Sequence, residues 1–155
     1  MILCIDLGLW KLGLAYYSQE GELLEAKTIK REDSPQSRRG APAWVAMSEL
    51  PELPQEGAVV IESMQIDRRS RRASSDLLEL SAIGGAILSL ANDRGLTTFS
   101  YRPKVWKGNT PKDVSKARAK EALSTEELSR IADDNHDTWD AIALGLFHLK
   151  REGIL

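Results

Sequence analysis

Residues 1–8 read MILCIDLG, and this stretch decides the fold class that we expect. Residues 1–5 are an unbroken apolar run that ends at Asp6, without the polar alternation typical of a strand that faces water on one side. A run of this length and composition predicts a central β-strand that is covered on both faces.

Further apolar runs predict the other layers of an α/β protein. Residues 58–61 (AVVI) form a second fully apolar strand, which stops at Glu62. Residues 12–18 and 23–29 flank a Glu-Gly turn and predict an antiparallel hairpin. The remaining predicted elements are a strand at 96–101, helices at 43–50, 75–92, 112–123 and 125–131, a basic loop at 103–111 and a last helix that Asp133, Asp134 or Asn135 caps.

The order of these elements is β-β-β-α-β-α-β-α, which predicts a mixed sheet. Its first three strands form a meander, and the later strands arrive through right-handed helical crossovers.

Composition excludes disordered, fibrous and membrane-spanning proteins. The 155 residues are 42% hydrophobic and 28% charged, as in an ordinary globular domain. The longest uncharged stretch, residues 80–92, has 13 residues, whereas roughly 20 are needed to cross a bilayer, and no secretion leader precedes it. The single cysteine, Cys4, fits a small buried side chain in a reducing cytoplasm. We therefore expect one domain over residues 1–155 and no membrane partner.

The net charge of −2 averages over segments of opposite sign. Residues 102–120 carry seven cations against one acid, and residues 121–140 carry seven acids against one cation. A second cationic cluster comprises Arg68, Arg69, Arg71 and Arg72. This distribution favours a polyanionic partner together with a site that concentrates carboxylates.

Four carboxylates are candidates for a metal site. Asp6 and Glu62 end two strands, and they come out side by side if a crossover places these strands next to each other. Asp137 and Asp140 are three residues apart, which places them on one face of the last helix. Grouped acids repel unless cations lie among them, and Mg²⁺ prefers oxygen ligands. Two such ions would activate water and stabilise the leaving oxygen in phosphodiester cleavage.

Each acid also has an ordinary structural interpretation. An acid that ends a strand is commonly a solvated turn residue, and acids in the first turn of a helix are favoured by the helix dipole. Asp140 is different, because it directly precedes the apolar stretch AIALG (141–145), where an unpaired carboxylate is costly. The convergence of four acids, rather than any one of them, supports the metal site.

Three motifs together resemble those of the RuvC-type Holliday junction resolvases. They are IDLG at 5–8 with Gly13 downstream, VIE at 60–62 and DTWDAIA at 137–143. The resemblance spans nearly the whole chain and implies an RNase H-like nuclease domain, with a mixed five-stranded sheet flanked by helices. It also implies a homodimeric, Mg²⁺-dependent enzyme, in which Mn²⁺ substitutes, that cuts four-way DNA junctions at symmetric points. Such enzymes act in DNA recombination and repair, and here the compartment would be the bacterial cytoplasm, with a cellular or a phage gene as the source.

The same resemblance implies roles for single residues. The ligands of two metal ions would be Asp6, Glu62, Asp137 and Asp140. His136 is the alternative to Asp137, since some relatives carry histidine in the last motif. Lys107 follows the strand at 96–101 where the family places a lysine near the scissile phosphate, so it would stabilise transition-state charge.

Further residues are predicted to bind DNA or a second copy of the chain. Phosphate contacts are expected from Arg68, Arg69, Arg71, Arg72, Lys104, Lys112 and Lys116, although charge runs are also commonly just solvated. Trp106 either stacks on a base or packs internally. Gly84 and Gly85 in helix 75–92 indicate a close approach, either by the chain's own sheet or by a second copy. The resemblance favours the homodimer, because a twofold enzyme matches a junction with two equivalent strands.

Other functions remain as alternatives. Another RNase H-like nuclease, acting on branched DNA, RNA or an RNA–DNA hybrid, would use the same carboxylates. A non-catalytic junction-binding module would bind without cutting. The Asp-x-Gly sequence at 6–8 also occurs in the actin-like ATP-binding fold, but that fold needs about twice this length.

Overall fold

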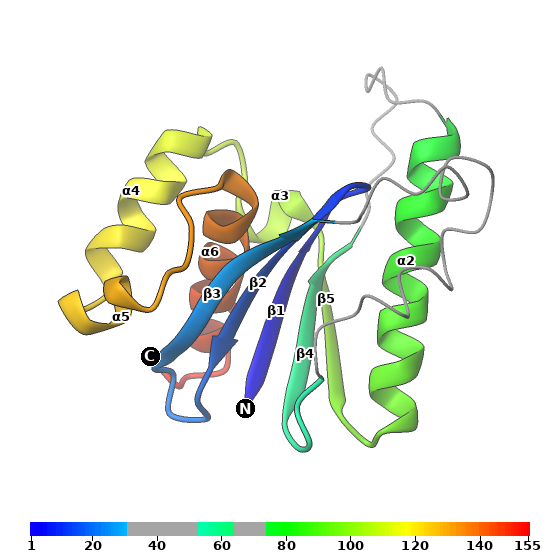
Figure 1. Ribbon diagram of the computed structural model, residues 1–155, viewed down its shortest axis with the longest axis horizontal. Helices are drawn as coiled ribbons and strands as arrows, with labels where there is room; N and C mark the ends of the chain where they lie inside the picture. The colour runs from blue at the N-terminus through cyan, green and yellow to red at the C-terminus, as the bar shows by residue number, and fades with distance from the viewer. Residues whose placement is uncertain (31–52, 64–73) are drawn as a thin grey trace.

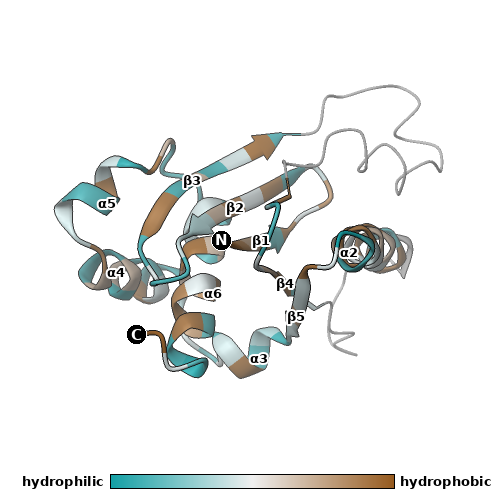
Figure 2. Cartoon of the chain, turned by 90° about the horizontal axis from the view of Figure 1, so that it is seen from below, coloured by the Kyte–Doolittle hydropathy of each residue, from teal (hydrophilic) through white to brown (hydrophobic). Residues whose placement is uncertain are grey.

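The computed structural model describes residues 1–30, 53–63 and 74–155. A five-stranded sheet lies between helix α2 on one face and helices α3 to α6 on the other side (Figure 1). The view in Figure 2 shows the same arrangement, with hydrophobic residues recurring along the strands and along α6. The helix predicted at 43–50 lies outside the described residues.

The sheet has the predicted mixed topology. Its strands are β1 (Ile2–Leu7), β2 (Lys11–Tyr17), β3 (Leu23–Lys30), β4 (Ala58–Glu62) and β5 (Thr97–Tyr101). The order is β3-β2-β1-β4-β5, with antiparallel pairing from β1 to β3 and parallel pairing of β1, β4 and β5. The α/β fold class and the five-stranded mixed sheet are confirmed.

The helices also follow the sequence pattern, with one exception. They are α2 (Ser74–Asp93), α3 (Pro103–Trp106), α4 (Lys112–Ala122), α5 (Thr125–Ser129) and α6 (His136–Arg151). The prediction of a loop throughout 103–111 was wrong, because α3 forms one helical turn there. Pro103 occupies the first position of that turn, where its fixed φ suits a helix and its missing N–H costs nothing. Within the described ranges, no helix is long and apolar enough to cross a membrane.

Strand β1 is buried on both faces, as its apolar sequence predicts. Leu3 and Ile5 belong to the hydrophobic cluster on the α2 side, whereas Cys4 belongs to the cluster on the α6 side. All three residues have an exposed fraction of 0%. Burial raises the pKa of the Cys4 thiol, so this side chain is a neutral part of the core.

Helix α6 lies directly against β2 because small residues allow the contact. A Cβ at Gly145 would overlap the ring of Tyr17, and a Cβ at Gly13 would overlap the backbone carbonyl of Asp137. The Tyr17 hydroxyl donates a hydrogen bond of 2.8 Å to the backbone carbonyl of Ile142. These contacts hold α6, whose first turns carry the predicted acidic residues, against β2.

Candidate active site

The first two predicted acids lie at the carboxyl ends of neighbouring parallel strands. Strands β1 and β4 pair with Ile5 opposite Ile61, so the next residues along each strand are Asp6 and Glu62. The predicted crossover therefore places these two carboxylates at the same edge of the sheet, and this expectation is confirmed.

The other two acids approach from helix α6. Gly13 is the register partner of Asp6 on β2, and it is also the residue that touches the Asp137 backbone. The start of α6 is thus adjacent to the end of β1. Asp140 follows one turn later and is buried, whereas His136, the alternative ligand, is exposed. Asn135 is the residue that caps α6, since its side chain accepts a hydrogen bond from the Asp137 N–H.

The electrostatics show that the other three carboxylates act on Asp6. The pKa of Asp6 is raised well above its ordinary value, first by burial and then by the negative charges of Glu62, Asp140 and Asp137. The positive charge of Lys107 opposes this shift. Asp6 and these three acids, from β1, β4 and α6, are called the carboxylate cluster below, and ionising Asp6 beside them is costly without a cation.

Two neighbouring residues at the end of α3 hold members of this cluster. The Lys107 ammonium lies 2.6 Å from Oδ2 of Asp140, and both side chains are largely buried, with exposed fractions of 17% and 12%. The Trp106 indole Nε1–H donates a hydrogen bond of 3.0 Å to Oε2 of Glu62. The Lys107 ammonium also lies 5.1 Å from the centre of the Trp106 ring, within the range of a cation–π contact. The segment from α3 to Lys107 thus orients one acid from the sheet and one from α6.

The contact between Trp106 and Glu62 was not predicted. The sequence offered base stacking or internal packing for Trp106; the ring does pack against the core on the α6 side, and its N–H in addition binds a carboxylate. The position of Trp106 next to Lys107 could have predicted this contact. A segment that brings the lysine to the acids must bring the neighbouring tryptophan as well.

The donor atoms of the cluster suit a hard divalent cation. Asp6, Glu62, Asp137 and Asp140 offer carboxylate oxygens, the ligands that Mg²⁺ and Mn²⁺ accept. In the described part of the chain, no three acidic, histidine or cysteine side chains lie close enough together to hold one ion. The carboxylate oxygens therefore fit the metal chemically, while the ligand set is not closed.

The adjacent acids Asp133 and Asp134 have structural partners outside this cluster. Burial opposes ionisation of Asp133, but hydrogen bonds from Thr138, Thr28 and Asn135 outweigh it and lower the pKa. Asp134 accepts a hydrogen bond from the Trp139 indole at 2.8 Å. Asp133 thus connects β3 with the start of α6, and Asp134 binds a residue of α6. Neither acid belongs to the carboxylate cluster.

The predicted DNA-binding cations fall into three groups. Lys104 and Lys112 are exposed at the beginnings of α3 and α4. The Lys116 ammonium is paired with Asp134 at 2.7 Å. The third group, Arg68, Arg69, Arg71 and Arg72, lies outside the described residues.

No protein-family model and no curated protein matches this chain. Its structure is similar to that of Thermus thermophilus RuvC in complex with a Holliday junction substrate, with 24% identity, a TM-score of 0.64, and coverage of 99% of this chain and 96% of that chain.

It is also similar to Fowlpox virus resolvase in complex with Holliday junction DNA (14% identity, TM-score 0.62, coverage 97% and 99%). A third similar structure is the yeast mitochondrial Holliday junction resolvase Ydc2 (14% identity, TM-score 0.57, coverage 97% and 79%). The chain therefore has the RNase H-like fold that these Holliday junction resolvases share, and the resemblance seen in its motifs extends to three dimensions.

Proposed function

We propose that this chain is a RuvC-type endonuclease that depends on a divalent metal and resolves four-way DNA junctions by symmetric phosphodiester cleavage. The observation that carries the proposal is the convergence of Asp6, Glu62, Asp137 and Asp140 at one edge of the sheet. Support comes from the shared fold, since two of the similar structures are complexes with Holliday junction DNA. The cellular role would be DNA recombination and repair, in the cytoplasm.

The four carboxylates would hold two Mg²⁺ ions, and Mn²⁺ would substitute. When bound, these ions would supply activation of water and neutralisation of charge on the leaving oxygen. The raised pKa of Asp6 supports this assignment, because a cluster that is costly to ionise alone is one that a cation stabilises.

The chain's own cationic and indole groups would complete the site. Trp106 holds the carboxylate of Glu62 in one orientation through its Nε1–H. The ammonium of Lys107 is kept at the edge of the cluster by Asp140 and by the Trp106 ring. From there it would stabilise negative charge on the phosphate in the transition state, as a fixed charge in a partly dry site.

Exposed cations would position the DNA. We assign contacts with backbone phosphates to Lys104 and Lys112, which flank the loop that carries Lys107. Phosphate contacts are also proposed for Lys116, once released from Asp134, and for Arg68, Arg69, Arg71 and Arg72. Loss of a phosphate contact should weaken binding to all sequences and flatten its dependence on salt.

The proposed active form is a homodimer through helix α2. Gly84 faces its own sheet, where a Cβ would lie 3.0 Å from Leu7 and 3.4 Å from Ile61, so packing within the chain accounts for this glycine. No atom of the described residues lies within 4 Å of a Cβ placed at Gly85, and Leu78 on the same helix is 72% exposed. An exposed leucine two turns from Gly85 on the same helix supports a second copy there, and twofold symmetry would present one site to each of two strands.

The test is cleavage of a synthetic four-way junction with Mg²⁺, beside linear duplex, flap and RNA–DNA hybrid substrates. We expect cleavage of the junction at symmetric positions. Asp6→Asn and Glu62→Gln should abolish cutting and retain junction binding, whereas Glu20→Gln, an exposed acid in the turn between β2 and β3, should behave as the wild type. Undiminished cutting by the first two variants would reject the site. Preferred cutting of the hybrid or flap would instead identify another RNase H-like nuclease.

A further inference from the structure

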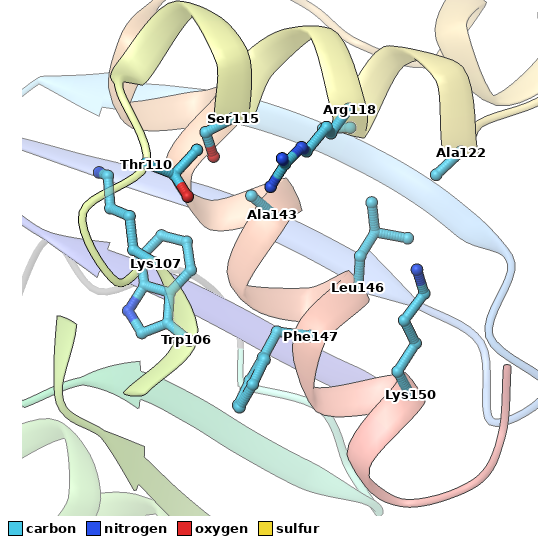
Figure 3. A pocket seen from close by; sticks show the side chains of 11 residues that line it. Trp106, Lys107, Thr110, Ser115, Arg118, Ala122, Ala143, Leu146, Phe147 and Lys150 are labelled. Atoms are coloured by element: carbon cyan, nitrogen blue, oxygen red, sulfur yellow. The ribbon is translucent and has the colours of Figure 1, made fainter. Parts of the chain in front are cut away.

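A pocket of about 220 Å³ lies between α3, α4 and α6, next to the proposed active site. Its floor is made by α6 through Ala143, Leu146 and Phe147, and α4 contributes Ala119 and Ala122. Figure 3 shows Trp106 and Lys107 at one end and Lys150 at the other, with Arg118 and Phe147 on opposite sides between them. The pocket therefore combines two aromatic rings with cationic side chains around an aliphatic floor.

The charges that line this pocket select an anion. Arg118 and Lys150 contribute two cations, the charge of Lys107 is already paired with Asp140, and no described lining residue is acidic. The structure gives Arg118 and Lys150 no ion pair within the described ranges, and both residues are exposed at the rim. The hydroxyl groups of Thr110 and Ser115 add neutral hydrogen-bonding groups. An anionic ligand would gain charge-assisted hydrogen bonds here without meeting a carboxylate.

The volume of the pocket and its two aromatic rings restrict the class of ligand that fits. Pockets for drug-sized molecules usually exceed about 300 Å³, so this one suits a single ring system with a small attached group. Proteins that bind single-stranded nucleic acid pair a cationic groove for the backbone with aromatic side chains for the bases. A nucleotide combines a flat ring with a phosphate, which match the aromatic rings and the cations of this pocket.

The pocket and the carboxylate cluster share two residues. Trp106 lines the pocket and donates to Glu62, and Lys107 lines the pocket and pairs with Asp140. A DNA strand that passes the carboxylates would thus run beside the Trp106 ring of the pocket.

We propose that this pocket binds one unpaired nucleotide of the DNA strand being cut, with the base against Trp106 and Phe147 and a phosphate at Arg118 and Lys150. This inference rests on the proposed function and adds a determinant of substrate choice to it. The pocket makes unpaired bases near the point of cleavage part of what the enzyme recognises.

The first test measures binding of the full chain to fluorescein-labelled single strands in EDTA, so that no cutting occurs. One strand carries four thymidines, and a matched strand carries four abasic sites with the same phosphates. We expect the thymidine strand to bind about tenfold more tightly, within the range for stacking one base on aromatic side chains. Equal binding of the two strands would overturn the proposal.

Three variants connect that preference to the pocket. Ala122→Trp fills the pocket from an exposed position at the end of α4, and it should remove the preference for thymidine while melting as the wild type does. Arg118→Gln should weaken binding several-fold. Lys120→Gln removes the same charge from the same helix but outside the pocket lining, and it should have a smaller effect. An unchanged base preference in Ala122→Trp, or equal losses in Arg118→Gln and Lys120→Gln, would overturn the proposal.

A third experiment distinguishes binding of a DNA strand from binding of a free nucleotide. Together with the cleavage assay, the binding data also distinguish failure of this inference from failure of the proposed function. Thymidine monophosphate should compete only weakly, and an affinity equal to that of the strand would overturn the assignment to the DNA strand. Base-dependent binding by a protein that cuts no junction would refute the proposed function alone. Junction cutting with no base dependence would refute this inference alone.

Discussion

Replacing Asp6 by asparagine should stabilise the metal-free protein, although it removes a residue of the proposed active site. Burial and three neighbouring acids raise the pKa of Asp6 in the folded state above its value in the unfolded chain. The folded protein therefore binds the Asp6 proton more tightly than the unfolded chain does, so ionised Asp6 lowers the free energy of unfolding. Asparagine keeps the shape of the side chain and removes this cost.

The size of the gain in the free energy of unfolding, and its pH dependence, follow from the same contacts of Asp6. A buried polar group without a sufficient partner costs about 1–3 kcal/mol, and Lys107 offsets only part of this cost. In a chain of 155 residues, 1 kcal/mol changes Tm by about 2–4 °C, so we expect Asp6→Asn to melt about 2–12 °C higher at pH 8. Below the ordinary carboxyl pKa of 3.8, Asp6 is protonated in both states and costs nothing. The difference between the two proteins should grow as the pH rises above that value and level off above the folded pKa.

The assay is thermal unfolding of wild type, Asp6→Asn and Glu20→Gln from pH 4 to pH 8 in EDTA, repeated with Mg²⁺. Glu20→Gln controls for loss of one negative charge at an exposed turn and should shift Tm little at any pH. Added Mg²⁺ should raise the Tm of the wild type and shrink its difference from Asp6→Asn, since binding to the folded state stabilises it. A gain that is absent at pH 8, or that falls as the pH rises, would refute the reasoning.

Three further substitutions test how the site is held. Gly13→Ala should cost about 1–3 kcal/mol and lower Tm and cleavage together, because its Cβ would overlap the first turn of α6; a wild-type Tm would contradict this close approach. Trp106→Phe keeps the ring and loses the N–H donated to Glu62, so junction cleavage should fall about 10- to 100-fold with binding unchanged. An unchanged cleavage rate would show that this hydrogen bond does not position the carboxylate. Tyr17→Phe removes the hydroxyl that bonds the Ile142 carbonyl, which should cost about 1 kcal/mol and lower Tm by about 2–4 °C while leaving the pH dependence intact. A Tm equal to that of the wild type would mean that the buried bond contributes nothing net.

Most of the fold could be predicted because its central strands carry a simple signal. Residues 1–5 and 58–61 are uniformly apolar, and runs this short favour a strand covered on both faces over a buried helix. Helix α3 could not be found in the same way. Its four residues form a single turn, too short for a helical period, and it ends in a basic stretch whose composition indicates a loop.

The four acids could be predicted for a related reason. Asp6 and Glu62 lie at the ends of predicted strands, and Asp137 and Asp140 lie in the first two turns of a predicted helix, so the topology brings them together; their role as metal ligands stays a prediction. The partners of these acids depend on tertiary contacts, which leave no periodic signal. The indole of Trp106 reaches Glu62 across 44 residues of sequence, and the Lys116 ammonium is paired with Asp134 instead of standing free for phosphate.

The segment from α3 to Lys107 contacts two acids of the site, and it also links these acids to the pocket. Trp106 orients an acid that belongs to the sheet, and Lys107 pairs with an acid that belongs to α6. Because the two residues are adjacent and share one backbone, a shift of this segment must move both contacts together. The same two side chains form one end of the pocket. A nucleotide in the pocket would therefore act on Glu62 and Asp140 at once, so substrate recognition and the arrangement of the carboxylates are coupled through a single turn of helix.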